Sequence, residues 1–555
     1  MKSRTSFFNA TVFWKDITRF APAWALYFIG GLLVALNIIA SPYNGGSTAS
    51  NLFRLLPVSA FISLVFGLVN AQLLFGDLLN KKMCNALHAM PIRRETWFST
   101  HFIAGILFLL VPHALLATFV GCFMGQYWYL APLWLLATTV QYLFFFSVAV
   151  FCATCTGQRF AGVALYWLVN FLSQLVMWFV NSFYIPLLKG IVLPVRIFNY
   201  FSPAVHLIGL EGDYVRFTSY LSNADHRMHY EFTSFGDSWW YLIAVAAAAV
   251  VFAVVALLLY RRRKLERAGD FIAFFWLEPV FSILLTLCAG AFLQAIFGTG
   301  FMFVGFVIGF FVSQMLLQRR VNVFKKKTFI TLGVFVGVMV LSLVLTFLDP
   351  LGITRWTPKP QQVKSVVLTD DYNFDPLYDE PYYLISLEDA DAIEDVIDIH
   401  EMLIEAGFNN NAPGWISGAY STRQPVSLVY TLHDGRTVSR SYYYAGEGGI
   451  GVALKKFYTR PEFIMGYANW EHFIQNVSQV SVNNHAVYGE QAKDLLRALK
   501  ADCDAKAIYT HEYKYSDLQF YVEYRYGDKF RNIGIGPDCE NTISYVKEHI
   551  PDWKS

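Results

Sequence analysis

Residues 240–260 read WYLIAVAAAAVVFAVVALLLY, and the next four residues are Arg261, Arg262, Arg263 and Lys264. As a helix rising about 1.5 Å per residue, this run is long enough to cross the roughly 30 Å hydrocarbon core of a bilayer. We therefore predict a polytopic α-helical membrane protein with about nine spans. The other eight apolar runs cover residues 21–40, 56–76, 101–120, 131–154, 160–182, 271–293, 299–317 and 329–348.

The composition supports this fold class. Of the 555 residues, 55% are hydrophobic and 15% are charged, and the mean hydropathy is +0.40. A typical soluble domain has roughly 25% charged residues. So few charges argue against a disordered chain, a nucleic-acid-binding protein and a wholly soluble enzyme. Charged residues become frequent after Asp349-Pro350, so we predict that a separate domain covers residues 350–555.

The distribution of Lys and Arg predicts the orientation. If the N-terminus is cytoplasmic, about nineteen basic residues fall in the inner segments and five in the outer loops before the last span. This asymmetry follows the positive-inside rule. No convincing cleavage site follows the first run, which we therefore interpret as an anchor. Nine crossings would make the C-terminal domain extracytoplasmic, and the loss of one span would place it inside.

Two segments are amphipathic, and the first lies within residues 1–20. It is predicted to be an interfacial N-terminal helix, with Lys15 and Arg19 mostly off its apolar stripe. The alternative is a helical extension of the first span. The stripe consists of Phe8, Val12, Phe13, Ile17 and Phe20.

The second amphipathic segment connects spans two and three and reads GDLLNKKMCNALHAMPIRRE over residues 76–95. Pro91 is expected to end a short helix here, and Glu95 suits the first turn of the next helix. A short basic and apolar helix on the cytoplasmic side would form a docking surface for a soluble partner. The alternative is a basic turn that only sets the topology. The predicted apolar stripe is Leu79, Met83, Leu87 and Met90.

This connection, extended to NKKMCNALHAMPIRRETWFSTHFIAGI, resembles the permease subunits of ABC-2-type transporters, especially the Gram-positive branch. The N-terminal helix and the stretch LLLYRRRKLERAGD after span six add to the resemblance, which covers roughly residues 1–270. It implies a six-span core over 21–268 in a bacterial cell membrane, a separate ATP-binding subunit and a second permease. It also implies an ATPase-coupling segment that contains Lys81, Lys82, Met83, Leu87, His88, Met90, Pro91, Arg93, Arg94 and Glu95.

The chain departs from that family in its three additional spans over 269–349 and in its C-terminal domain. It contains no Gly-x-x-x-x-Gly-Lys-Ser/Thr string, which a P-loop needs to hold phosphates. We therefore expect a non-catalytic subunit without cofactor or metal, and ATP hydrolysis in a partner chain.

Ionisable residues are rare within the spans, which disfavours an ion pathway and favours an amphipathic substrate. His113 and Glu278 form a possible intramembrane polar site, because an acid within a span is a functional hypothesis by default. The alternative for Glu278 is a position near the inner end, where it reaches headgroups or a basic loop. Cys152 and Cys155 have metal-like spacing but are interpreted as packing residues, since no second Cys or His pair is nearby.

The C-terminal domain is predicted to be a duplicated α+β domain, with halves over about 360–460 and 474–555. Each half reads as a strand, a helix and a hairpin. His400 falls on an apolar helix stripe where the second half has Leu499, so we interpret it as a core histidine. Cys503 and Cys539 are the only cysteines of this domain, and whether they form a disulfide is open. The acidic stretch between Asp370 and Glu380 is interpreted as a solvated loop.

The sequence thus favours a permease that moves or extracts an amphipathic, lipid-like or peptide-like molecule with a separate ATPase. The alternative is a membrane-anchored sensor whose outer domain captures a ligand. A membrane enzyme is disfavoured, because no nucleophile and base occur in a convincing arrangement.

Overall fold

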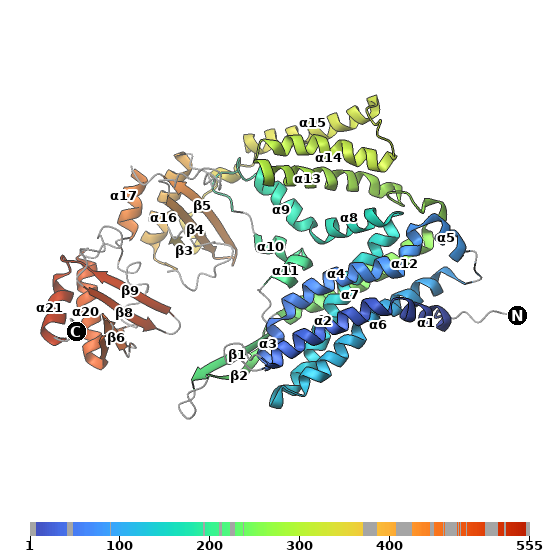
Figure 1. Cartoon of the computed structure of the whole chain (residues 1–555). Helices are drawn as coiled ribbons and strands as arrows, with labels where there is room; N and C mark the ends of the chain where they lie inside the picture. Colours follow the sequence, from blue (N-terminus) through green and yellow to red (C-terminus); the bar gives the residue numbers. More distant parts are fainter. Residues whose placement is uncertain are drawn as a thin grey trace. The chain divides into compact units, whose positions relative to one another are not determined.

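The chain forms two compact units in the computed structural model (Figure 1). The first comprises Met1–Phe179 and Ile197–Phe335, and the second comprises Val180–Arg196 and Val336–Ser555. The residues that the structure describes are 7–40, 48–88, 90, 92–192, 195–209, 214–221, 228–236, 238–369, 386–406, 424–444, 449–458, 460, 474–475, 477, 479–483, 485–505, 520–526 and 529–550.

Within these described residues, eight helices are long and apolar enough to cross a membrane, so the chain is a polytopic helical protein. They match eight of the nine predicted runs. A short 3-10 turn, η3 (Gly125–Leu130), leads directly into α7. The eight helices are α2 (Ala21–Ala40), α4 (Leu56–Leu74), α6 (Arg94–Gly121), α7 (Ala131–Cys155), α12 (Ser238–Arg262), α13 (Glu278–Phe297), α14 (Phe301–Gln318) and α15 (Lys326–Leu348).

The ninth predicted run is not one continuous helix, so that prediction is wrong in detail. It forms α8 (Arg159–Asn170) and α9 (Leu172–Phe183), which meet at an angle of 63°. The break frees a backbone carbonyl in an apolar setting, where it needs a donor. The Ser202 hydroxyl supplies one by donating to the Asn170 carbonyl at 2.9 Å, and Ser173 donates to the Phe198 carbonyl at 2.6 Å. Polar contacts from the following segment therefore stabilise the bend.

The beginnings of α8 and α9 are linked to opposite ends of α12. Where α8 begins, the Gly269 amide, just beyond the end of α12, donates to the Gly157 carbonyl at 2.7 Å. Where α9 begins, the Gln174 amide donates to Asn199 at 2.9 Å. The neighbouring Tyr200 carbonyl accepts from the Tyr241 hydroxyl, in the first turn of α12, at 2.9 Å.

The segment between the bent pair and α12 contains two short helices, α10 (Val195–Tyr200) and α11 (Pro203–Ile208). It also contains an antiparallel hairpin that the sequence analysis missed, β1 (Val215–Leu221) and β2 (Met228–Phe235). At the N-terminus, α1 (Ala10–Arg19) is a helix separate from α2, capped by the Asn9 side chain and ended at Phe20. A second short helix, α3 (Thr48–Arg54), precedes α4.

The first half of the C-terminal domain has an antiparallel sheet in the order β3-β4-β5. Its elements are β3 (Val363–Thr369), α16 (Ala390–Glu405), β4 (Gln424–Leu432), β5 (Thr437–Tyr444) and α17 (Gly449–Tyr458). The second half has a four-stranded sheet in the order β7-β6-β8-β9. Its elements are β6 (Gln479–Val482), β7 (His485–Tyr488), α20 (Gly489–Asp504), β8 (Phe520–Tyr526), β9 (Lys529–Ile535) and α21 (Glu540–His549).

Each half buries its own hydrophobic core between its sheet and its helices. Each contains a strand, a helix and a hairpin in the same order, and each ends in a further helix. Cys503 and Cys539 are buried thiols that are not joined. The acidic stretch from Asp370 to Glu380 lies outside the described residues.

The core of the first half contains a buried titratable group, the His400 imidazole. Its side chain is fully buried, and the hydroxyls of Tyr442 and Tyr430 lie 2.9 Å and 3.1 Å from its two ring nitrogens. Burial lowers the pKa of His400 to about 3, with nearby Arg440 adding to the effect. The prediction of a satisfied core histidine is confirmed.

The loop after α9 extends the sheet of this first half. The Ser441 amide on β5 donates to the Gly190 carbonyl at 3.1 Å, and Ile191 forms a β-bridge with Arg440. Gly190 has a φ of +73°, and a Cβ there would lie 2.1 Å from the Tyr442 hydroxyl. Only glycine fits this position. The loop after α9 and the C-terminal domain therefore lie on the same side of any membrane that the four long helices between them, α12 to α15, cross.

Acid should destabilise the first half of the C-terminal domain more than the second. His400 has a folded-state pKa of about 3 and an ordinary value of 6.5, so the unfolded state binds the additional proton between these values. The contribution of neutral His400 to the free energy of unfolding should be fully present above about pH 6.5. It should fall by about 1.4 kcal/mol per pH unit toward pH 3. Hydrogen exchange of α16 in the full-length protein, corrected for intrinsic rates, measures this slope.

The second half provides the control, because α20 has Leu499 at the position equivalent to His400. His400→Leu should flatten the slope of α16 even if it lowers stability at every pH. Equal slopes for α16 and α20 in the wild-type chain would contradict the prediction.

Candidate functional site

The connection between α4 and α6 is built from two short helical pieces. The 3-10 turn η2 (Gly76–Leu79) ends at Asn80, whose backbone is extended with φ −125° and ψ 119°. The Asn80 side chain then accepts from the Lys82 amide at 3.0 Å and starts α5 (Lys81–His88). Because the chain breaks at Asn80, η2 and α5 are separate, and the predicted single apolar stripe from Leu79 to Met90 is wrong. Leu79 is buried in η2, whereas Met83 and Met90 are exposed and α5 buries Cys84 instead.

One arginine joins this connection to two long helices. Arg263 follows the end of α12 and is only 3% exposed. Its guanidinium donates to the carbonyls of Ala153 and Thr154 at 3.0 and 3.1 Å, and to the Leu78 carbonyl at 3.0 Å. The last carbonyls of a helix have no partner within the helix, so Arg263 caps the end of α7 while it holds η2.

A second arginine holds the start of α6 against the same point. The Arg94 guanidinium donates to the Arg263 carbonyl at 3.0 Å. Glu95 forms an ion pair with Arg261 at 3.1 Å. The connection and the first turn of α6 are therefore fixed to the ends of α7 and α12.

A tight backbone crossing completes this end of the bundle. The Ala273 amide donates to the Cys155 carbonyl at 2.8 Å, beside the contact between Gly269 and Gly157. A Cβ at Gly157 would lie 2.4 Å from the carbonyl oxygens of Arg267 and Asp270, so the crossing requires glycine there. Asp270 also pairs with Arg319 at 2.7 Å, which ties in the end of α14. Cys152 and Cys155 are fully buried in α7 and serve as packing residues, as predicted.

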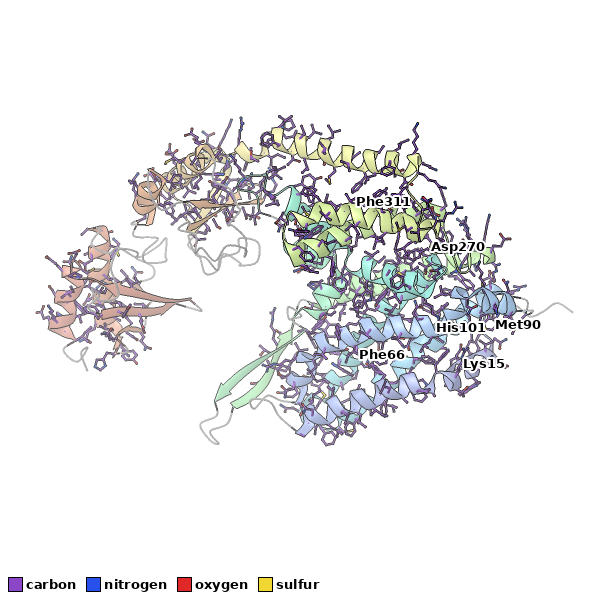
Figure 2. All side chains as sticks on the ribbon, turned by 45° about the horizontal axis from the view of Figure 1, so that its top comes forward. Lys15, Phe66, Met90, His101, Asp270 and Phe311 are labelled. Atoms are coloured by element: carbon purple, nitrogen blue, oxygen red, sulfur yellow. The ribbon has the colours of Figure 1, made fainter. Side chains whose placement is uncertain are left out.

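The N-terminal helix is attached to α6 at the same end of the bundle. The Asp16 carboxylate lies 2.6 Å from Nδ1 of His101, and both side chains are buried. The Asn9 amide donates to the Thr100 hydroxyl at 3.1 Å. Figure 2 shows Lys15, Met90, His101 and Asp270 gathered at one end of the helical unit, with Phe66 further along the bundle. Helix α6 therefore receives contacts from the N-terminal segment and from the end of α12 near its beginning.

The structure divides the predicted coupling residues into two groups. Lys81, Lys82, Met83, Met90 and Arg93 are exposed and available to a partner. Arg94 and Glu95 are instead engaged with the end of α12. Pro91 and the side chains of Leu87 and His88 lie outside the described part of the chain.

His113 and Glu278 lie on different helices and have different neighbours. His113 is buried on α6, where its ring contacts Trp134 and its Nε2 is hydrogen-bonded to the Tyr27 hydroxyl. Glu278 is the first residue of α13, whose first turn packs on Phe271 through Phe281. A carboxylate is favoured at the N-terminus of a helix. This position agrees with the alternative that Glu278 lies near one end of the span. The sequence did not predict Tyr27 and Trp134 as neighbours of His113, because their spacing is like that of other aromatic residues in the spans.

No protein-family model matches the chain, and comparisons with curated proteins and with solved structures found no similar protein. The resemblance to ABC-2 permeases therefore remains a prediction from the sequence.

Arg263→Met should destabilise the helical unit far more than Arg262→Met. The first substitution leaves three buried carbonyls without a donor, and each buried acceptor without a partner costs about 1–3 kcal/mol. Arg262 is exposed, so its replacement removes the same charge from the same loop at little cost. Thermal unfolding of the two purified variants in one detergent measures the difference, and equal midpoints would contradict the role given to Arg263.

Proposed function

We propose that the chain is the permease subunit of an ATP-driven transporter and that a separate ATPase docks on residues 81–93. One observation carries the proposal: the described residues of this connection expose three cations and two methionines, while Leu78 before it and Arg94 after it are bonded to Arg263. Met83 and Met90 are 40% and 46% exposed, and Lys81, Lys82 and Arg93 are exposed beside them. Flexible apolar side chains among cations suit a protein partner, since methionine adapts to irregular surfaces.

The contacts of the connection provide a mechanical path. A displacement of α5 and η2 by the partner acts on Arg263 through the Leu78 carbonyl. Arg263 passes it to α7, and Arg94 passes it to α6. Since these bonds are buried or partly buried, the ends of the helices move with the connection instead of sliding past it. The ATPase would thereby bias two arrangements of the bundle that differ in their affinity for the substrate.

The orientation is part of the proposal: N-terminus in the cytoplasm of a bacterial cell and C-terminal domain outside. One observation supports nine crossings. The chain just before α8 contacts the residues after α12, and the start of α9 is linked through Asn199 and Tyr200 to the first turn of α12, so we count the bent pair as one crossing. The pairing of the loop at Gly190 with β5 agrees with four crossings by α12 to α15 and does not depend on the bent pair. The basic residues then lie inside, in agreement with the positive-inside rule.

The low charge of the long helices supports the substrate class in this proposal. No long helix carries more than two charged residues over its most apolar eighteen-residue window. An amphipathic molecule, lipid-like or peptide-like, fits such an apolar interior better than an ion does.

Charge reversal on the exposed face tests the proposal. Lys82→Glu combined with Arg93→Glu should lower the amount of co-purified ATP-binding chain by about tenfold or more, because like charges oppose docking. The matched control is Lys325→Glu with Lys326→Glu, which reverses two exposed charges in the connection between α14 and α15. Affinity purification from the native host, with mass spectrometry and an ATPase assay of the captured material, provides the measurement.

Equal capture by both double variants, or repeated purification without any ATP-hydrolysing chain, would overturn the proposal. A captured signalling protein that lacks ATPase activity would favour the sensor alternative.

A further inference from the structure

The connection between α14 and α15 covers residues 319–327 and reads RRVNVFKKK. It contains five cations, all exposed, and no acidic residue. Within the part of the chain that the structure describes, one of the five forms an ion pair: Arg319 binds Asp270 at 2.7 Å. The other four charges have no carboxylate partner among these residues, and they belong to Arg320, Lys325, Lys326 and Lys327.

Apolar side chains lie among these cations on a hydrogen-bonded backbone. Val323 is fully buried and anchors the connection. The Lys325 carbonyl accepts from the Thr328 amide at 2.9 Å in the first turn of α15. Val321 and Phe324 are instead 80% and 57% exposed. The α14–α15 connection therefore presents cations and apolar side chains together on one surface.

The Phe324 ring joins this surface to both helices. Its centroid lies 5.0 Å from that of Phe311 on α14 (Figure 2) and 6.5 Å from that of Phe329 on α15. Phe311 is half-buried, and Phe329 is 51% exposed. The apolar surface beside the cations thus continues along two helices that are long enough to span a membrane.

Helix lengths place the connection at the membrane interface. The 18 residues of α14 and the 23 of α15 extend about 27 Å and about 34 Å, close to the roughly 30 Å of hydrocarbon. The start of α13 lies at the same end, because its Ser282 hydroxyl is 2.6 Å from that of Ser313 on α14. Just before α13, Phe275 and Trp276 are 78% and 56% exposed. Exposed tryptophan at the end of a span is typical of the interface. The four cations therefore lie at the depth of lipid phosphates.

We propose that the α14–α15 connection binds the phosphodiester headgroup of an anionic phospholipid. The lysine ammonium groups donate to the phosphate oxygens, and the acyl chains lie on Phe324, Phe311 and Phe329. Four uncompensated cations favour a headgroup with net negative charge over a zwitterionic one, and apolar contact adds to this attraction.

The phenylalanines distinguish a lipid from a soluble acidic partner. Such a partner could meet the cations, but it would not reach Phe311 and Phe329, which lie within the spans. The inference goes beyond the proposed function, since it needs no ATPase and does not depend on which side of the membrane the connection faces.

The test measures which lipid the full-length protein retains. The purified protein in detergent is incubated with equal amounts of dioleoyl phosphatidylglycerol and dioleoyl phosphatidylcholine, which have the same acyl chains. Mass spectrometry then quantifies the lipid that remains bound after gel filtration. The wild-type protein should prefer the anionic lipid by about tenfold or more. Each cation near an anionic lipid surface contributes about fivefold, so Lys325→Gln with Lys326→Gln should bring the preference to within about twofold.

The matched control is Arg262→Gln with Lys264→Gln. It removes two exposed cations after α12, where Glu266 follows them, and it lowers the basic charge of the chain by the same amount. Its lipid preference should equal that of the wild-type protein. Phe324→Ala should lower the retention of both lipids alike, because it removes contact with the acyl chains and no charge. Thermal unfolding in the same detergent verifies that all variants are folded.

Equal preferences in the two double variants would overturn the inference, because any cations near the ends of the spans would then serve as well. Release of bound phosphatidylglycerol by excess inorganic phosphate would also overturn it, because the connection would then bind an anion without its acyl chains. Since no ATPase is present in the assay, either result leaves the proposed function standing.

Discussion

The buried guanidinium of Arg263 holds together the end of the helical unit on which the proposed function depends. The end of α7 and the turn η2 meet there, and both bring backbone carbonyls that need a donor from outside their own element. One planar group with five donors satisfies three of them at about 3 Å, and its own carbonyl accepts from Arg94. A lysine could not span these positions, because its ammonium is a compact point charge without a fixed fork of donors.

The same requirement for hydrogen-bonded backbone explains the other irregular points of the bundle. The bend between α8 and α9 persists because Ser202 satisfies the freed Asn170 carbonyl. The crossing at Gly157 persists because no side chain separates its backbone from that of residues 267–270.

The two halves of the C-terminal domain fill an equivalent core position with different types of side chain. Helices α16 and α20 both have sixteen residues and place their eleventh residue in the core. In the second half that residue is Leu499, which needs only apolar neighbours. In the first half it is His400, which two tyrosine hydroxyls satisfy, so we expect this core to lose stability in acid. Similar secondary structure therefore does not imply similar pH dependence.

The sequence alone predicted the long helices and the strand, helix and hairpin of each half of the C-terminal domain, because hydrophobic periodicity and span length are local properties. It also placed His400 in a core. Tertiary structure alone decided that Arg94 and Glu95 are engaged, that Arg263 rather than Arg261 or Arg262 is buried, and that Tyr27, His113 and Trp134 meet. Three consecutive arginines look alike in sequence. Which of them finds unpaired carbonyls depends on where the ends of other helices lie, and only packing between distant segments sets that.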